Sequence, residues 1–299
     1  MLRENSNKTG YVYLLITVLL FSTYEVVSKT LVGKVNPFEI NFIRFTIGGV
    51  ILFAVLFIKS DYKIGMTDFI WTLILGVLNV VASMNLLQLS LYVKGAQASV
   101  TAVIFSSNPI FVALFAAYFE KEKLNIYKII GLLMGVAGIS AIFFNKLRAG
   151  FTDFRSPLLA LSSALLFGLY TVLGRKVSMR IGSIKMNAYS FISGALVLMP
   201  ILLIFNIPIV YFKPSGIIQV VYLSVLCTGI AYITYFRGLE IVGASKGSLV
   251  YFLKPVLASL IAIIFLNEHP SINLFIGTAL IICGIFFVIY MSKREKLRT

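Results

Sequence analysis

The sequence predicts an all-α integral membrane protein with ten transmembrane helices, arranged as two inverted five-helix repeats. Three observations lead to this prediction. Hydrophobic residues make up 59% of the 299 residues and charged residues only 12%, whereas soluble chains carry about 25% charged residues. Apolar stretches of membrane-spanning length recur along the whole chain instead of collecting in one core. The chain also matches itself when it is shifted by 146 residues.

Crossing a hydrocarbon core of about 30 Å takes roughly 20 helical residues. Ten segments of about this length follow one another: 10–31, 38–59, 67–92, 96–119, 126–145, 157–176, 186–206, 216–238, 244–266 and 272–291. Each is expected to be a helix, because backbone amides in lipid have no water to bond and short loops do not suit a β-barrel. The first segment is too long for a signal peptide, so it is expected to be the first helix of the mature chain.

The charge distribution predicts how these helices lie in the membrane. The net charge of +15 is spread over loops, helix ends and tails, so it builds no basic face for a nucleic acid. Alternate sides of the ten segments carry 16 and six Lys and Arg residues, and the richer side holds both termini. The positive-inside rule therefore predicts cytoplasmic termini in the cell membrane, plasma or inner, with lipids as partners. No metal or cofactor is expected, since Cys227 and Cys283 belong to no ligand cluster.

The internal match involves residue types that rarely coincide in membrane segments. It pairs Asn41 with Asn187, Gly48 with Gly194, Pro109 with Pro255, Glu122 with Glu268 and Gly131 with Gly277. The expected domains are residues 1–145 and 157–299, joined by a linker loop at 146–156. Because five is an odd number, the second copy would enter the membrane inverted. Inverted repeats are a common plan of secondary transporters, and a larger bundle without transport is the alternative.

Both repeats end their fourth helix alike, with a proline inside it, a glutamate just after it and a glycine-spaced helix next. The residues are Pro109 with Glu122 and Pro255 with Glu268. Together with the stretch 231–245 and the pair Arg44-Phe45, they resemble the EamA type of the drug/metabolite transporter superfamily over essentially the whole chain. The resemblance implies ATP-free export of amino acids, other metabolites or drugs. Enzyme activity is not expected, because Walker, zinc-protease and hydrolase motifs are absent.

Glu25 is the only carboxylate well inside a predicted helix. A charge near the bilayer centre costs about 2.5 to 3.5 kcal/mol, so it needs a partner, a watery cavity or a bound proton. A rise of about 1.5 Å per residue from Tyr11 puts Glu25 roughly 21 Å from the cytoplasmic end, in the outer half. The functional prediction is that Glu25 binds a proton or a cationic substrate in turn, which would couple two opposite flows.

The structural alternative for Glu25 is a buried ion pair. Lys29 lies one helical turn away, and Arg44 is expected at similar depth in the second helix. Such a pair would also suit an outer gate, so Lys29 is a candidate gating residue.

A second candidate feature is a polar residue directly before a proline. Lys254 precedes Pro255 near the middle of the ninth predicted helix, and Asn108 precedes Pro109 in the fourth. Proline lacks an amide hydrogen and its ring clashes with an earlier carbonyl, so it kinks a helix. Polar residues beside matching kinks predict a discontinuous-helix binding site. An ion pair or gate at Lys254, and ordinary helix curvature at the prolines, are the alternatives.

Aromatic and amide side chains supply the remaining candidates. Rings and hydroxyls suit organic cations or amino acids, although most aromatic residues are expected to pack or to face lipid. The aromatic candidates are Tyr24, Trp71, Tyr170, Tyr232, Tyr235 and Tyr251. Asn79, Asn85, Gln97 and Asn187 are expected to bond between helices or to join the cavity. Glu122, Glu268, Arg175 and Arg237 are expected to be solvated, bonded at helix ends or snorkelling.

The leading hypothesis is a proton-coupled secondary exporter of small cationic or zwitterionic metabolites or drugs, which works by alternating access with Glu25 as the exchanging acid. Its closest rival is an amino-acid or neutral metabolite exporter that is not coupled through Glu25, in which Lys254 and Arg44 bind the substrate carboxylate. A membrane receptor or lipid-modifying enzyme is the alternative from another class. The sequence is compatible with a monomer and sets neither substrate, direction nor oligomeric state.

Overall fold

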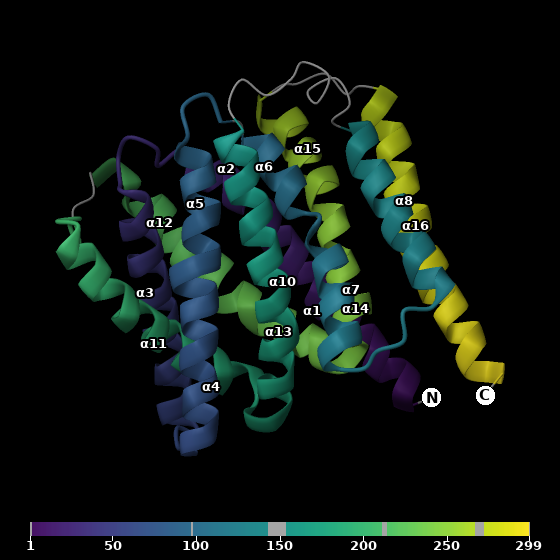
Figure 1. Cartoon of the computed structure of the whole chain (residues 1–299), viewed down its shortest axis with the longest axis horizontal. Coiled ribbons are helices and arrows are strands. Elements are labelled where there is room, and N and C mark those ends of the chain that lie inside the picture. The colour runs from purple at the N-terminus through teal and green to yellow at the C-terminus, as the bar shows by residue number, and fades with distance from the viewer. Residues whose placement is uncertain (1, 97, 143–153, 211–213, 267–271, 299) are drawn as a thin grey trace.

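The computed structural model describes residues 2–96, 98–142, 154–210, 214–266 and 272–298, and its regular elements in these ranges are all helices (Figure 1). Gln97, Glu268 and most of the expected linker lie outside the described residues. The first half contains α1 (Leu2–Ser22), α2 (Tyr24–Lys29), α3 (Pro37–Ile58), α4 (Met66–Gly76), a π-helix (Val77–Ser83), α5 (Met84–Tyr92), α6 (Ala98–Phe105), α7 (Asn108–Phe119) and α8 (Ile126–Ile142). The second half contains α10 (Arg155–Ile181), α11 (Ser183–Ile204), a 3-10 turn (Pro214–Gly216), α12 (Ile217–Tyr222), a π-helix (Leu223–Ile230), α13 (Ala231–Val242), α14 (Ala244–Ser248), a 3-10 helix (Leu249–Phe252), α15 (Leu253–Leu266) and α16 (Ile272–Arg298).

Seven helical segments in the described ranges are long and apolar enough to cross a membrane. They are Lys8–Lys29, Pro37–Ile58, Met66–Tyr92, Thr101–Phe119, Arg155–Ile181, Ser183–Ile204 and Pro214–Val242. Shorter apolar helices, Ile126–Ala141 and Phe275–Phe287, lie where the fifth and tenth spans were expected. The expected ninth span, 244–266, is divided among α14, a 3-10 helix and α15. The helical, multi-pass fold is confirmed, whereas seven long helices do not by themselves establish ten spans.

Helices from the two halves of the chain pack against one another. α3 packs on α11, α1 on α13, and α10 on α5 and α7, so the main core forms where the halves meet. α8 and α16 form a separate pair at one edge of the bundle (Figure 1). A Cβ atom on Gly138 would lie 2.7 Å from the carbonyl oxygen of Gly277. Glycine at this crossing therefore lets the two backbones approach closely, as small residues do between membrane helices.

Irregular backbone recurs at positions 146 residues apart. The two π-helices begin at Val77 and Leu223. α6 ends at Phe105, four residues before Pro109, and a 3-10 helix over Leu249–Phe252 precedes Pro255. Both interruptions follow from proline, whose ring clashes with the carbonyl four residues earlier and whose nitrogen cannot donate. Each half therefore carries a π-helix in its third predicted span and a break in its fourth.

One further break occurs in the first half without a proline. α1 ends at Ser22 and α2 begins at Tyr24. Between them the Thr23 Oγ1 hydroxyl donates to the Leu20 carbonyl oxygen at 2.8 Å, a bond within the chain's own turn that competes with regular helix geometry. The break leaves Glu25 in the first turn of a short new helix.

Candidate functional site

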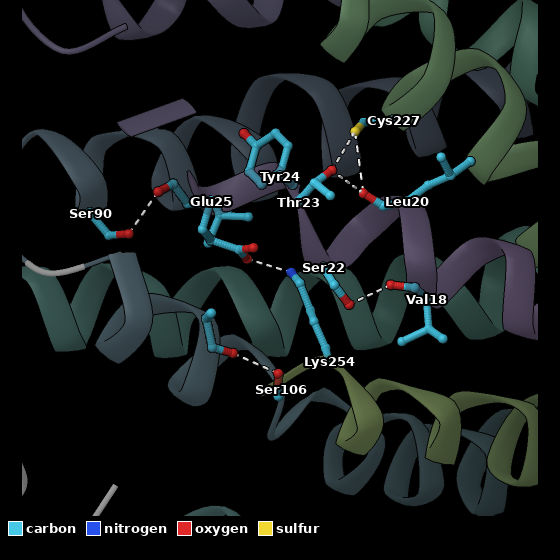
Figure 2. A network of polar contacts seen from close by, with 12 residues as sticks. Val18, Leu20, Ser22, Thr23, Tyr24, Glu25, Ser90, Ser106, Cys227 and Lys254 are labelled. Atoms are coloured by element: carbon cyan, nitrogen blue, oxygen red, sulfur yellow. Dashed lines mark hydrogen bonds and ion pairs between the residues drawn. The ribbon is translucent and has the colours of Figure 1, made fainter. Parts of the chain in front are cut away.

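Glu25 and Lys254 form a buried ion pair that joins the first predicted span to the ninth. Each residue is only 1% exposed, and Lys254 Nζ donates to Glu25 Oε1 (Figure 2). The ammonium also lies 4.9 Å from the centre of the Phe105 ring, a cation–π contact. The second carboxylate oxygen, Glu25 Oε2, is buried without a hydrogen-bond partner. The pair leaves half of the carboxylate free to accept another donor.

The two partners that the sequence suggested for Glu25 have other roles. Lys29 Nζ donates to the Leu91 carbonyl oxygen at 2.6 Å, and Arg44 Nε donates to the Thr228 hydroxyl at 3.1 Å. The i, i+4 spacing predicted Lys29 because this rule considers contacts within one helix only. The actual partner comes from the opposite half of the chain.

Arg44 is buried without a carboxylate partner. Its side chain is 1% exposed, and its guanidinium carbon lies 4.6 Å from the ring centres of both Tyr24 and Phe45. Thr228, which accepts from Nε, belongs to the π-helix Leu223–Ile230. The Nη1 atom has no hydrogen-bond partner, and none of the ion pairs among the described residues involves Arg44.

A small aromatic cavity lies beside these charges. Its lining residues are Phe21, Tyr24, Arg44, Met84, Leu87, Phe105, Phe167, Tyr232, Tyr251 and Lys254. The rings pack closely, with Phe21 stacked on Tyr251 at 5.8 Å between centres. The Tyr251 hydroxyl is buried without a hydrogen-bond partner. The free volume of about 20 Å³ holds about one water molecule, so a larger substrate could enter only after the helices move.

Several predicted site residues do line this cavity, and others do not. Tyr24 and Tyr251 line it, and the Tyr24 hydroxyl donates to Gln88 Oε1 at 2.6 Å. The Tyr170 hydroxyl instead donates to Asn187 Oδ1 at 3.2 Å, and Tyr170 packs behind the lining residue Phe167, with 5.7 Å between ring centres. Trp71 is half-buried against the main core and is not part of the lining.

Asn108 occupies a hydrogen-bonding position between helices. Its Nδ2 donates to the Ala164 carbonyl oxygen of α10 at 2.9 Å, and its Oδ1 has no partner. The sequence interpretation also missed three lining phenylalanines. Phe21 and Phe167 are paired by the internal repeat, and Phe105 lies four residues before Pro109. The repeat pairing and the closeness to Pro109 were the sequence features that could have identified these three phenylalanines as lining residues.

A charged network joins the two halves of the chain. Its glutamates follow α7, which ends on the side of the bundle that holds both termini (Figure 1). Arg175 of α10 donates through Nη1 to Glu120 Oε2 at 2.8 Å and through Nε to the Leu239 carbonyl oxygen at 2.7 Å. Lys128 Nζ donates to Glu122 Oε2 at 3.0 Å. Glu120 and Glu122 follow α7, whereas Arg175 and Leu239 belong to the second half. Glu122 is therefore bonded at a helix end, one of the two expected arrangements, whereas Arg175 links the two halves instead of only snorkelling.

The network shifts the acidity of its two glutamates in opposite directions. Burial raises the pKa of Glu120 more than the Arg175 cation lowers it. Burial also tends to raise the pKa of Glu122, but the nearby Ser245 hydroxyl and the Lys128 and Arg175 cations outweigh it, so the pKa of Glu122 is lowered. Glu122 is thus the more firmly ionised of the two.

A helical, multi-pass membrane protein with buried charges beside broken helices is the class that this fold and site define. The chain belongs to the EamA-like transporter family, whose model matches residues 8–144 and again residues 155–290. Its function is membrane transport and not enzyme catalysis.

Similar proteins extend over nearly the whole chain. An uncharacterized transporter of Clostridium kluyveri is 32% identical over 97% of this chain and 95% of its own length. An S-adenosylmethionine uptake transporter of Rickettsia felis is 23% identical over 97% of this chain and 95% of its own. One solved crystal structure has the same fold, with a TM-score of 0.78, 23% identity and coverage of 98% of this chain and 99% of that chain.

Proposed function

We propose that this transporter is a secondary exporter that exchanges protons for small cationic or zwitterionic molecules by alternating access. Ten membrane-spanning helices would form two inverted repeats, residues 1–145 and 157–299, with both termini in the cytoplasm. The recurrence of the π-helices and of the proline breaks at a spacing of 146 residues supports a repeated unit. Five spans per unit then require inversion, which would let the halves exchange inward-open and outward-open shapes.

The Glu25–Lys254 pair is the observation that supports proton coupling. A buried ion pair is held together because separating its charges in low dielectric is costly. A proton that binds Glu25 would remove the negative charge and release Lys254, so protonation and pairing would exclude each other. A substrate ammonium that binds Glu25 would compete in the same way. One carboxylate would therefore serve proton and substrate in turn.

The charged network around Arg175 would act as the inner gate. It ties the residues after α7 to α10 and α13, so opening the bundle at that end would have to break these contacts. The small cavity fits an occluded state. Alternating access would then consist of breaking this network in one state and the contacts near Glu25 in the other.

The outward direction rests on the family resemblance. The Rickettsia relative is named for uptake, so both directions need to be measured. Its named substrate, S-adenosylmethionine, carries a sulfonium and an ammonium group besides a carboxylate. A molecule of this kind would meet the cations Arg44 and Lys254, which line the cavity, and the Glu25 carboxylate that is paired with Lys254. The rival proposal, transport of amino acids without coupling through Glu25, is favoured by one observation, the unpaired Nη1 atom of Arg44.

A flux assay in liposomes tests the coupling. Purified protein would be reconstituted and labelled amino acids and a lipophilic cation followed in both directions, with and without a pH gradient. We expect uphill flux in the wild type, and in Glu25→Gln a loss of at least about tenfold, equivalent to about 1.4 kcal/mol. Asp61→Asn, which removes an exposed charge paired with Lys185, is the matched control and should transport normally. Uphill flux of the wild type that ignores the pH gradient would refute proton coupling.

A further inference from the structure

The buried charges around the cavity do not balance. Glu25 contributes one negative charge, whereas Lys254 and Arg44 contribute two positive charges, and all three side chains are 1% exposed. Lys254 is neutralised by Glu25. Arg44 forms no ion pair with a carboxylate among the described residues, either with Glu25 or with Glu39, which is also buried on α3. Because an uncompensated charge in low dielectric is strongly unfavourable, an anion is needed close to Arg44.

The surroundings of Arg44 orient it without neutralising it. The Thr228 hydroxyl accepts from Nε, and the rings of Tyr24 and Phe45 face the guanidinium. Hydroxyls and rings carry partial charges only, and Nη1 is left without a partner. Arg44 also lines the cavity. A planar guanidinium held on its sides, with a free nitrogen at a cavity, is well suited to bind a carboxylate.

We infer that Arg44 is an anion site, and that during transport its ligand is the carboxylate of the substrate. In the closed protein, where the cavity offers about 20 Å³, a small inorganic anion such as chloride would take the same place. This inference rests on the proposed function and narrows it, because a substrate that must neutralise Arg44 is zwitterionic and not purely cationic. Its carboxylate would bind Nη1 of Arg44, and its ammonium would approach the unpartnered Oε2 atom of Glu25.

Thermal unfolding of the purified full-length protein tests this site without any flux measurement. The protein in detergent would be titrated with sodium chloride or sodium acetate, with ionic strength held constant by sodium isethionate, a bulkier anion. We expect a saturable rise in Tm of about 5 °C at a hundredfold excess over Kd. Arg44→Met should abolish the rise and Arg44→Lys should keep part of it. Arg237→Met, which removes a more exposed arginine paired with Glu240, should behave as the wild type.

Each outcome of the titration decides a part of the inference. Stabilisation by both anions, in competition, supports a site shared by the substrate carboxylate and an inorganic anion. Stabilisation by chloride alone overturns the carboxylate role and leaves a resident inorganic anion. A wild type that neither anion stabilises overturns the inference, even if Arg44→Met fails to fold. Proton coupling through Glu25 is measured by the flux assay, so it is tested independently of this titration.

Discussion

Lys254 and Asn108 occupy the same place in the two halves of the chain, directly before a proline and 146 residues apart. Each reaches the first predicted span of the opposite half. Lys254 donates to the Glu25 carboxylate, whereas Asn108 donates to the Ala164 backbone carbonyl. One contact depends on the charge of both partners, and the other keeps its strength at any pH. We call the Lys254–Glu25 contact the charged corner and the Asn108–Ala164 contact the neutral corner. Both follow the same pattern of a polar residue before a proline, but titratable chemistry is present only at the charged corner.

The first spans differ in the same sense. The chain breaks at Thr23 just before Glu25, whereas α10 continues without interruption through Thr171, which holds the position equivalent to Glu25. Thr171 shares a hydrogen bond of 3.3 Å with the Tyr235 hydroxyl. The corner with the ion pair combines charge with an interrupted backbone, which favours it as the moving part. The neutral corner combines uncharged hydrogen bonds with a regular helix, which suits a contact that stays in place while the helices move.

The sharpest way to break this comparison is to convert the charged corner into a copy of the neutral one. Lys254→Asn should lower the free energy of unfolding by about 3 to 5 kcal/mol, because Glu25 is left as a buried charge without a partner. Adding Glu25→Thr, the residue found at the equivalent position 171, should recover most of this loss. Thermal unfolding of both variants measures the effect. A single variant as stable as the wild type would mean that the pair is not buried as described.

The neutral corner should respond less. Asn108→Ala removes one hydrogen bond to the Ala164 carbonyl oxygen, which keeps its place in the backbone of α10, at a cost of about 0.5 to 1.5 kcal/mol. The same unfolding measurement, repeated from pH 5 to pH 8, should give a loss that does not vary with pH, since neither partner titrates. A pH-dependent loss would show that the two corners are coupled, contrary to the comparison.

The smallest expected effect concerns Glu122 in the network at the end that holds both termini. Its pKa lies below the usual 4.5, so its contribution to stability is present above about pH 4.5 and is lost as the pH falls through the lowered value. Glu122→Gln should cost about 1 kcal/mol or less at pH 7 and reduce the loss of stability on acidification. Unfolding curves at pH 7 and pH 4 check this. Equal acid sensitivity of variant and wild type would contradict it.

The sequence predicted the helical fold and the interruptions near Pro109 and Pro255, because hydropathy and proline act locally. It did not predict the partner of Glu25. The repeat says which residues are equivalent, but not which helices of opposite halves touch. No proline marks the break at Thr23 in the sequence. The π-helices have no residue pattern that an analysis of hydrophobic periodicity detects. Trp71 and Tyr170 were chosen by residue type alone, which does not tell a cavity wall from a packed layer.

The closed aromatic cavity of about 20 Å³ also has a kinetic consequence. Sites for drug-sized ligands occupy about 300 to 1,000 Å³, so an organic cargo cannot bind this shape on encounter. Its observed association rate should rise with concentration and then level off at the rate with which the helices open. Beyond that point, different cargoes would load equally fast, and discrimination among them would rest on how long each one stays.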